Sequence, residues 1–252
     1  MSVTTIVIIP ARYHSTRFPG KPLVDINGKS MINRVYDQAI KSKSASQVWV
    51  ATDNEQIFNH VEGFGGKAIY TSPEHGSGTS RVAEAASLLL DDKHEDAVIV
   101  NLQGDEPFIN PQQIDDLIKL FEDSTVEIAT LVKKIDTIDE LKSVGEAKVV
   151  IDHENNAMYF SRSIIPYDNS NNMDVVGDTY YKHVGIYAYR FSTLKEIVNL
   201  PLCYVEKLES LEQLRWLYYG YKIKVAKTEY ESYCVDTPED LKKLINKKLP
   251  NY

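Results

Sequence analysis

IPARYHSTRFPGKP, at residues 9–22, is the stretch that decides the fold, because it joins a buried strand to a cationic loop. The apolar run 6–9 reads as a strand that stops at turn residues. Proline and glycine keep the following segment out of helix and strand, and it carries three cations, Arg12, Arg17 and Lys21. An open α/β sheet binds its ligand at such a loop, beyond the carboxyl end of a strand. The fixed cations predict that the ligand is a polyanion.

The overall composition narrows the choice of polyanion. A net charge of −8 disfavours nucleic acid, so we expect a small phosphate compound. The content of 43% hydrophobic and 25% charged residues is typical of a globular protein, and apolar runs stay shorter than the ~18 residues of a membrane span. A signal peptide is not recognisable, and Cys203 and Cys234 lack disulfide-framework or metal-site spacing. We expect a cytoplasmic protein that binds neither nucleic acid nor membranes.

Strand and helix signals alternate through the first part of the chain. Such βαβα alternation predicts an α/β fold whose mostly parallel sheet has helices on both faces. The predicted helices begin at Ser30, Asn54, Ser77 and Pro111, where capping residues or a first-turn proline precede amphipathic runs. The predicted strands occupy residues 6–10, 47–52, 68–71, 97–102 and 127–132.

The pattern changes after about residue 145. Strands are predicted at 148–152, 158–161 and 182–190, with a polar loop at 166–177, and helices resume at 192–199, 208–219 and 238–248 around a strand at 223–226. We therefore expect a single domain, residues 1–252. Its nucleotide-binding core would comprise about 1–145 and 192–252, and an inserted β-rich lobe, about 146–191, would serve the second substrate and a subunit interface.

Two aspartates lie in segments where their carboxylates could bind a metal ion together with a phosphate. Asp105 follows the strand at 97–102 in a Gln-Gly-Asp-Glu-Pro turn, and Mg²⁺ is usually held by one or two carboxylates plus phosphate oxygens. The alternative is a turn aspartate that caps the next element. Asp236 is the second candidate ligand, although an Asp-Thr-Pro-Glu-Asp run is also an ordinary helix start.

Weaker signals point to the rest of the site. The run at 76–81, Gly-Ser-Gly-Thr-Ser-Arg, opens a helix whose backbone amides and hydroxyls could hold a base or ribose, or it is an ordinary loop. It matches neither the Rossmann fingerprint nor the Walker A pattern. Arg162 and His183 are candidates for binding an anionic group of a second substrate, although a lone histidine on a strand is more often structural.

Taken together, the motifs resemble a known family. IIPARYHSTRFPGKPLVDINGKSMI, HGSGTSR, VNLQGDEPFI, YFSRSIIPY, HVGIYAYR and VDTPEDL occur in the order found in the 3-deoxy-manno-octulosonate (Kdo) cytidylyltransferases of lipopolysaccharide biosynthesis. The resemblance runs from residue 8 to 241 and implies a Rossmann-like nucleotide-diphospho-sugar transferase fold. It also implies a homodimer that transfers CMP from CTP to a Kdo-like sugar acid.

The resemblance assigns roles residue by residue. Catalysis falls to Arg17, Lys21, Asp105 and Asp236, and the two aspartates would bind Mg²⁺. The nucleotide would be bound by Ala11, Arg12, Arg17, Lys21, Ser77, Gly78 and Gln103. The sugar acid would be bound by Arg81, Arg162, His183, Tyr187, Glu212 and Gln213.

Some positions depart from the family pattern. Gly76 and Ser80 replace a glutamine and a glutamate, Tyr167 replaces a tryptophan and Lys182 an arginine, while Glu146 stands in an altered Asn-x-Val-Lys motif. We interpret these changes as a shift in sugar preference, for example toward 8-amino-Kdo, with cytidylyl transfer retained. The alternatives are a neuraminate cytidylyltransferase, a sugar 1-phosphate nucleotidylyltransferase, or a non-catalytic CTP-binding protein.

Overall fold

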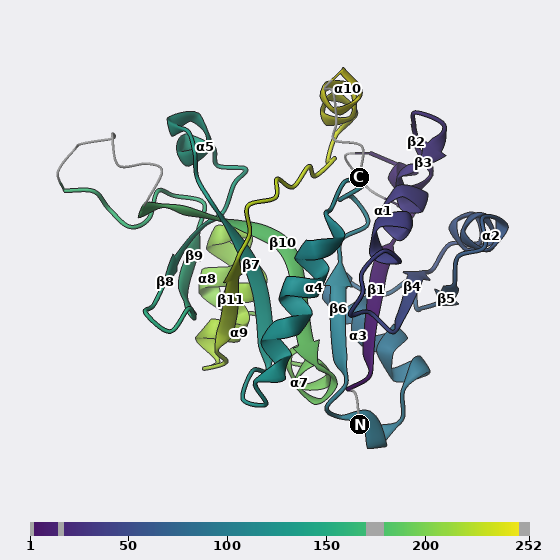
Figure 1. The fold of residues 1–252 in the computed structure, drawn as a ribbon, viewed down its shortest axis with the longest axis horizontal. Helices are drawn as coiled ribbons and strands as arrows, with labels where there is room; N and C mark the ends of the chain where they lie inside the picture. Colours follow the sequence, from purple (N-terminus) through teal and green to yellow (C-terminus); the bar gives the residue numbers. More distant parts are fainter. Residues whose placement is uncertain (1–2, 15–17, 170–178, 247–252) are drawn as a thin grey trace.

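A nine-stranded sheet forms the centre of the molecule (Figure 1). The computed structural model describes residues 3–14, 18–169 and 179–246, with the side chains of 245 and 246 left out. Along its main path the strand order is β11-β7-β10-β6-β1-β4-β5, and β8 and β9 extend it beside β10. The strands are β1 Thr5–Ala11, β4 Gln47–Thr52, β5 Ala68–Tyr70, β6 Val98–Leu102, β7 Ile128–Lys134, β8 Lys148–Ile151, β9 Ala157–Ser161, β10 Tyr181–Arg190 and β11 Ile223–Lys227.

The predicted α/β class with a mostly parallel sheet is confirmed. Strand β1 pairs in parallel with β4 and β6, β4 with β5, and β11 with β7. Strand β10 is antiparallel to both β6 and β7. Because β1 and β6 run side by side, the segments that follow them leave the sheet at one edge, which is where the cationic loop and the Asp105 turn meet.

Helices cover both faces of the sheet, and each face has its own apolar core. Helices α1, α2 and α4 cover one face, and α3, α7 and α9 the other. The predicted cap at Ser30 is present, since its side chain accepts a hydrogen bond from the Asn33 amide at 3.2 Å. The helices are α1 Met31–Ala39, α2 Glu55–Gly63, α3 Gly78–Leu89, α4 Pro111–Lys119, α5 Ile138–Lys142, α7 Phe191–Ile197, α8 Tyr204–Glu209, α9 Gln213–Tyr218 and α10 Pro238–Asn246.

The predicted lobe shares a strand with the core. Strands β8 and β9 form an antiparallel pair, and β8 also pairs with the start of β10 at Tyr181 and Lys182. Strand β10 then continues between β6 and β7. The segment 146–191 therefore ends in a strand that crosses from the lobe into the central sheet, and Figure 1 shows β8 and β9 at one side of the molecule.

One helix predicted from the sequence is divided into two helices in the structure. The sequence predicts a single helix over 208–219, whereas the chain forms α8 and α9 with Ser210 between them in the left-handed conformation, at φ 52°. The physical reason lies in Glu209, whose carboxylate accepts hydrogen bonds from the Ser161 hydroxyl at 2.6 Å and the Arg162 amide at 2.9 Å. These contacts fasten the end of α8 to β9, and the chain turns before α9.

Smaller elements complete the fold. Among the described residues, none of the helices has the length and apolar character needed to span a membrane. The remaining short elements are the 3-10 turns Lys21–Leu23, Asp92–His94 and Leu120–Glu122 and the two-stranded pair β2 Asp25–Ile26 and β3 Lys29–Ser30.

Candidate active site

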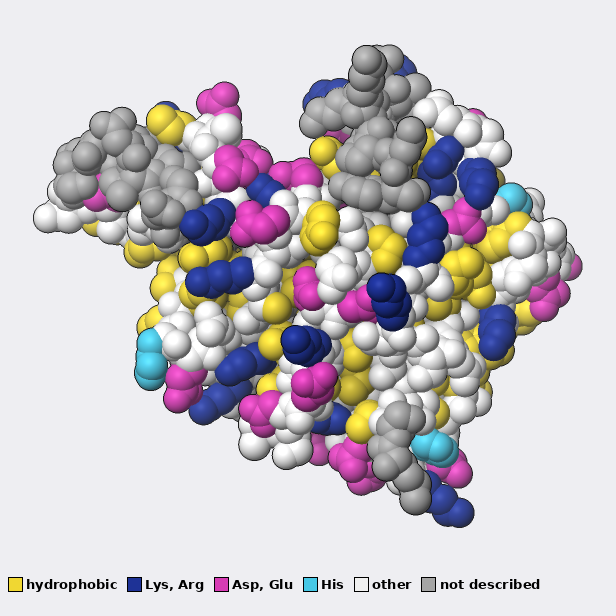
Figure 2. Space-filling view, viewed as in Figure 1, with side chains coloured by type: hydrophobic (Ala, Val, Ile, Leu, Met, Phe, Trp, Pro, Cys, Tyr) yellow, Lys and Arg dark blue, Asp and Glu magenta, His cyan; other side chains and the backbone are white. Residues whose placement is uncertain are grey.

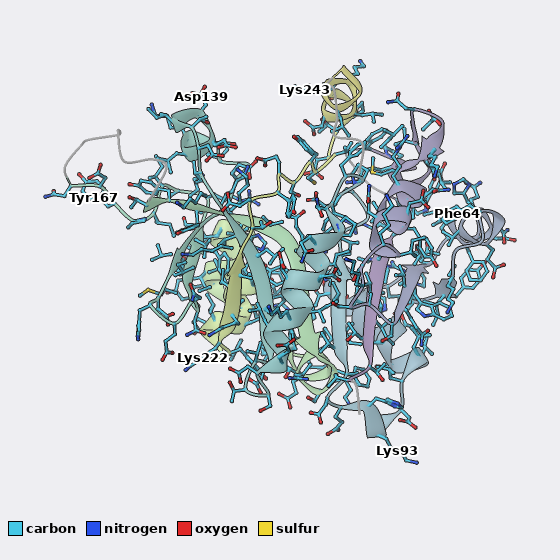
Figure 3. The ribbon with its side chains drawn as sticks, viewed as in Figure 1. Phe64, Lys93, Asp139, Tyr167, Lys222 and Lys243 are labelled. Atoms are coloured by element: carbon cyan, nitrogen blue, oxygen red, sulfur yellow. The ribbon has the colours of Figure 1, made fainter. Side chains whose placement is uncertain are left out.

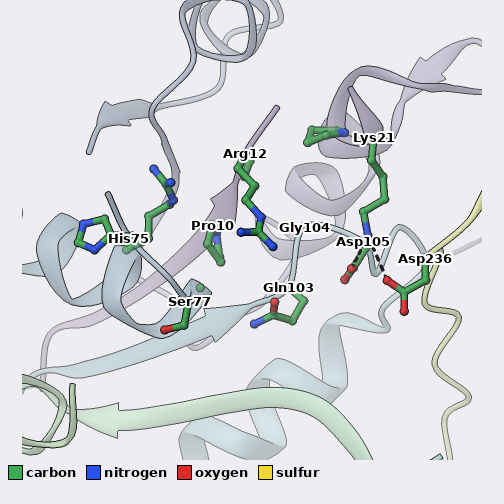
Figure 4. Close-up of a pocket in the computed structure, with 13 residues that line it drawn as sticks. Pro10, Arg12, Lys21, His75, Ser77, Gln103, Gly104, Asp105 and Asp236 are labelled. Carbon is green, nitrogen blue, oxygen red and sulfur yellow. Dashed lines mark hydrogen bonds and ion pairs between the residues drawn. The ribbon is translucent and has the colours of Figure 1, made fainter. Parts of the chain in front are cut away.

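A pocket opens where β1 and β6 end (Figure 4). Figure 4 shows His75 and Ser77 at one end, Lys21 with Asp105 and Asp236 at the other, and the Arg12 side chain between them. Four parts of the chain far apart in sequence therefore meet around one hollow. The lining residues are Pro10, Ala11, Arg12, Lys21, Pro22, His75, Ser77, Gly78, Arg81, Gln103, Gly104, Asp105 and Asp236.

The floor of the pocket depends on close contact between two backbones. Ile8 of β1 lies opposite Asn101 of β6, so the chain segments that follow these two residues stay adjacent. A Cβ atom at Gly104 would stand 3.0 Å from the carbonyl oxygen of Pro10. A backbone oxygen cannot move aside as a flexible side chain can, so glycine is required here for the turn to place Asp105 over the pocket.

The amino end of α3 forms the second wall. Ser77 caps this helix by accepting a hydrogen bond from the Ser80 amide at 3.2 Å, and Ser80 completes the capping box. A Cβ atom at Gly78 would meet the Pro10 ring at 3.3 Å, so the helix start packs tightly against the end of β1. Unpaired amides at a helix start attract anions and polar ligand atoms, which suits a nucleotide.

A lysine bridges the two candidate metal ligands. The Nζ of Lys21 lies 2.7 Å from Asp105 Oδ2 and 3.4 Å from Asp236 Oδ1. Burial by itself would lower the pKa of Lys21, but the charges of Asp105 and Asp236 outweigh it and the pKa is raised above 10.5. The ammonium is therefore charged at any physiological pH, and it neutralises one carboxylate of the pair.

The same carboxylates have the donor set of a divalent cation site. Ligand atoms of Asp105, Asp236 and Cys234 all lie within 4.8 Å of one another. Burial, followed by the nearby carboxylates, raises the pKa of Cys234, so its sulfur remains a neutral thiol. The charged donors are then two carboxylates, and hard carboxylate oxygens suit Mg²⁺.

Glu106, next to this group, is a feature that the sequence analysis did not identify. Its side chain is buried and accepts a hydrogen bond from the Ser232 hydroxyl. Burial raises the pKa of Glu106 from 4.5 to about 8, with a further contribution from Asp105. A carboxyl that remains largely protonated near neutral pH adds little negative charge beneath the pocket.

A second cluster lies against the far side of α3. His183 and Tyr187 of β10 have ring centroids 5.1 Å apart, and Trp216 of α9 packs edge-on against Tyr187 at 5.0 Å. Glu212, just before α9, accepts a hydrogen bond of 2.6 Å from the Thr79 hydroxyl. Since Thr79 is the second residue of α3, this contact joins the second cluster to the helix that lines the pocket.

Several polar atoms in this cluster are buried without a matched partner. The hydroxyls of Tyr187 and Tyr189 and the amide nitrogen of Gln213 form no hydrogen bond of normal geometry within the described part of the chain. Groups of this kind are costly unless water or a ligand satisfies them. Tyr187 and Gln213 are two of the residues predicted to bind the sugar acid.

His183 is held neutral within the cluster. Its Nε2 lies 3.0 Å from the Thr130 hydroxyl, and that hydroxyl donates its proton to the Ile186 carbonyl at 2.7 Å. The Thr130 oxygen must therefore accept from His183, which assigns the ring proton to Nε2. Burial lowers the pKa of His183 from 6.5 to about 3, so the ring is an uncharged hydrogen-bonding group and not a cation.

The two arginines predicted to bind the sugar acid lie in different surroundings. Arg81 lines the pocket, but its guanidinium donates to Thr71 at 2.6 Å and to Asp53 at 3.1 Å. Arg162 lies outside the pocket lining, and its guanidinium donates to the backbone carbonyls of Glu209 and Val144, both at 2.9 Å. Both side chains thus hold protein groups in place in this structure.

The structure divides the predicted site residues into two groups. Those that line the pocket are Ala11, Arg12, Lys21, Ser77, Gly78, Arg81, Gln103, Asp105 and Asp236. Those outside its lining are Arg162, His183, Tyr187, Glu212 and Gln213. Arg17 lies outside the described residues.

The sequence analysis did not assign a role to His75. It lines the pocket, and its ring is paired with the carboxylate of Glu84, the seventh residue of α3. Both residues stand close together in the sequence, because His75 directly precedes the Gly-Ser-Gly-Thr run and Glu84 follows His75 by nine residues. A pairing between a loop residue and a helix residue is not apparent from helical periodicity alone.

Two of the departures from the family pattern lie away from both clusters. Lys182 and His183 are successive residues of β10, so they face opposite sides of the sheet, and the Lys182 Nζ is bound by Glu231 at 2.6 Å and Glu140 at 3.0 Å. Tyr167 is 80% exposed, and Figure 3 shows it on a projecting loop at the edge of the molecule. Within the described part of the chain, neither residue is among those that line the pocket.

Charges of both signs are interspersed on the face shown in Figure 2. Lysine and arginine side chains lie among aspartates and glutamates over this face, without forming a continuous basic stripe there. A duplex-binding surface would show such a stripe along one face. The cations near the pocket, Arg12 and Lys21, are instead gathered at one hollow.

Known proteins resemble this chain over nearly its whole length. The profile of a family described as cytidylyltransferase matches residues 6–223. The chain is 48% identical over 244 residues to the 3-deoxy-manno-octulosonate cytidylyltransferase of Thermodesulfovibrio yellowstonii, covering 95% of this chain and 96% of that one. It is 47% identical over 245 residues to the 8-amino-3,8-dideoxy-manno-octulosonate cytidylyltransferase of Shewanella frigidimarina, covering 96% and 97%.

A solved structure extends the similarity to three dimensions. It is a CMP:2-keto-3-deoxy-manno-octonic acid synthetase complexed with CTP, which superposes with a TM-score of 0.88 and 40% identity. The superposition covers 96% of this chain and 97% of the other.

Proposed function

Because this chain belongs to the 3-deoxy-manno-octulosonate cytidylyltransferase family, we propose that its pocket binds CTP and that the cluster beyond α3 binds the sugar acid. The chain is an enzyme that transfers CMP from CTP to Kdo or a close analogue and releases pyrophosphate. A neuraminate substrate or a purely CTP-binding role is not favoured by these relatives. The observation that carries the proposal is the meeting of Arg12, Lys21, Asp105 and Asp236 in one pocket beside a helix start.

The chemistry requires charge stabilisation more than a protein nucleophile. The anomeric oxygen of the sugar acid attacks the α-phosphorus of CTP, a new C–O–P linkage forms, and the bond to the pyrophosphate oxygen breaks. The hydroxyl proton leaves to solvent or to a phosphate oxygen. Arg12 and Lys21 stabilise the negative charge that grows on the departing pyrophosphate, and Arg17 is proposed to join them.

Asp105 and Asp236 are proposed to hold Mg²⁺, which fits their carboxylate donors. When bound there, the ion neutralises phosphate charge and makes the α-phosphorus more electrophilic. Gln103, Ser77 and Gly78 lie at the other end of the pocket in Figure 4, where they would orient the nucleoside. Correct orientation of the two substrates supplies much of the acceleration in such a reaction.

The identity of the sugar acid depends on contacts at the second cluster. Relatives that act on Kdo and on its 8-amino analogue are almost equally similar to this chain, at 48% and 47% identity. Of the departures, Gly76 and Ser80 lie at the start of α3, so a shift in preference would have to arise there or at Glu146. Lys182 lies on the opposite face of β10 from His183, and Tyr167 is exposed, so we do not assign the choice of sugar acid to them.

We also propose that the enzyme is a cytoplasmic homodimer. Exposed apolar side chains gather on α8, α9 and β9, among them Tyr204, Leu208, Tyr218 and Met158, at 64%, 80%, 55% and 61% exposure. Tyr204 and Tyr218 are in edge-on contact at 6.0 Å. A contiguous apolar patch of this kind suits a subunit interface. Both cysteines are free, in keeping with a reducing compartment.

Pyrophosphate release from the purified enzyme with CTP and Mg²⁺ tests the proposal. Kdo, 8-amino-Kdo and neuraminic acid are offered separately, with an assay lacking sugar acid as the blank. We expect release with Kdo or its 8-amino analogue and none with neuraminic acid. Light scattering on the same sample measures the subunit number. Release with none of the three would contradict the proposal.

A further inference from the structure

The position of the Lys21 ammonium is incompatible with a metal ion between the same carboxylates. A magnesium ion binds carboxylate oxygens at about 2.1 Å. The Lys21 Nζ already lies 2.7 Å from Asp105 Oδ2 and 3.4 Å from Asp236 Oδ1, so it stands in the space that a shared ion would take. Figure 4 shows both contacts converging on the lysine tip. Two cations cannot share that position, because they would overlap and repel each other.

The backbone of Lys21 is fixed, so the displacement must come from its side chain. Gly20, at φ 70°, precedes the 3-10 turn Lys21–Leu23, and the Gly20 amide donates to the Tyr13 carbonyl at 2.9 Å. Pro22 is buried beside it. A lysine has four rotatable methylenes, so its tip can swing while its backbone stays in place. Lys21 itself lines the pocket, and the Arg12 side chain lies next along it in Figure 4, so the hollow is within reach of that swing.

We propose that Lys21 acts as a resident counter-ion that keeps divalent metal off Asp105 and Asp236 until a triphosphate draws its ammonium into the pocket. The inference rests on the proposed function, since it names the ligand that moves Lys21. It predicts that metal and nucleotide bind with positive coupling, and that much of this coupling resides in one side chain. By thermodynamic linkage the coupling is mutual, so bound metal tightens nucleotide binding by the same factor.

Binding of Mn²⁺ to the full-length enzyme, followed by the electron paramagnetic resonance signal of the free ion, tests the first half. No nucleotide is present, so the readout does not depend on activity. We expect Lys21→Met to bind Mn²⁺ at least tenfold more tightly than the wild type. We expect Lys21→Arg, which keeps a cation, to stay within about threefold of the wild type. Lys29→Met is the matched control, because Lys29 pairs with Asp37 on the surface.

Two further measurements keep the inference falsifiable. Asp105→Asn is then added to Lys21→Met, and we expect the double variant to lose the tighter Mn²⁺ binding. If the tighter binding persists, the extra Mn²⁺ binds elsewhere and the inference fails. Water-proton relaxation then measures the Mn²⁺ affinity of the CTP-saturated protein. Because phosphate oxygens also bind the ion, CTP should tighten Mn²⁺ binding in both proteins, and we expect that factor to be at least tenfold larger in the wild type than in Lys21→Met. Equal Mn²⁺ binding by wild type and Lys21→Met would overturn the inference. The proposed function is tested separately, by pyrophosphate release from the wild type.

Discussion

The hydroxyl of Thr79 donates a hydrogen bond of 2.6 Å to the carboxylate of Glu212. Thr79 belongs to the helix that lines the nucleotide pocket, and Glu212 to the segment that carries the second cluster. With the binding sites proposed above, the contact would couple the position of the sugar acid to that of the nucleotide. In-line transfer depends on such alignment, since small misplacements of reacting groups cost large factors in rate.

Thr79→Val tests this coupling with little change in shape. We expect the KM for the sugar acid to rise several-fold and kcat to fall about tenfold, because Glu212 loses its anchor. The KM for CTP should change less than twofold. The free energy of unfolding should fall by about 1 kcal/mol, the usual contribution of one such hydrogen bond. A lower stability with unchanged KM values and an unchanged kcat would show that the contact serves stability alone.

Gly104→Ala should damage both stability and activity. The new methyl group would meet the Pro10 carbonyl at 3.0 Å, and a backbone atom must shift to accommodate it. We expect the free energy of unfolding to fall by about 1–3 kcal/mol and pyrophosphate release to fall at least tenfold.

Gly63→Ala is the control for that change, because a Cβ there has no atom within 4 Å. This helical glycine should gain up to about 1 kcal/mol on substitution. Urea unfolding of both variants makes the comparison. Unchanged stability in Gly104→Ala would show that the two strand ends can separate without cost.

Acid should destabilise the enzyme partly through His183. Its pKa is about 3 in the folded protein against an ordinary 6.5, so below pH 6.5 the unfolded chain binds a proton that the folded chain does not. Stability must therefore decrease as the pH falls from about 6.5 toward 3, by at most about 1.4 kcal/mol per pH unit from this residue.

Urea unfolding between pH 7.5 and 5 measures that slope. His183→Gln keeps a donor toward Thr130 but cannot titrate, so its stability should depend less steeply on pH than that of the wild type. His153→Gln removes an exposed histidine and should leave the slope unchanged. Parallel curves for His183→Gln and wild type would mean that His183 takes up a proton as readily in the folded protein as in the unfolded chain.

Lys182→Met should affect stability but not the choice of sugar acid. Its ammonium is 6% exposed and holds Glu140 and Glu231 together, so its loss should cost about 1–3 kcal/mol. Because Lys182 faces away from His183, the ratio of kcat/KM for Kdo to that for 8-amino-Kdo should change less than twofold. A larger change in that ratio would show that Lys182 does help to determine which sugar acid is preferred.

The core of the fold was predictable because its signals are local. Buried β-branched runs, the Ser30 cap and the Pro111 helix start each follow from a few neighbouring residues. The single helix predicted over 208–219 was wrong, because the break at Ser210 depends on the Glu209 contact with β9, some fifty residues away in sequence. The crossing of β10 into the central sheet likewise depends on pairing partners that periodicity does not reveal.

Part of the pocket lining was predictable from local patterns. Arg12, Lys21 and Asp105 could be expected near one another because their loops follow strands, and strand ends meet at one edge of a parallel sheet. Ala11 and Gln103 were assigned only through the family resemblance. His75 was not assigned, since its partner Glu84 becomes apparent only in space. Side chains alternate between the two faces of a strand, so Lys182 lies on the opposite face from its neighbour His183. The comparison with the family motif considered only which residue stands at each position and did not use this alternation. Long-range contacts, and not composition, determine these details.

The central claim is that Asp105, Asp236 and Lys21 form the phosphate- and metal-binding end of a cytidylyltransferase site. The most direct measurement is the rate of pyrophosphate release with saturating CTP, Mg²⁺ and Kdo or 8-amino-Kdo, in the wild type and in Asp105→Asn and Asp236→Asn. Removing one group that stabilises the charge of a transition state costs about 10²–10³ in rate, and we predict a loss of at least that size for each variant, with folding intact by circular dichroism. Rates within threefold of the wild type for both variants would contradict the account.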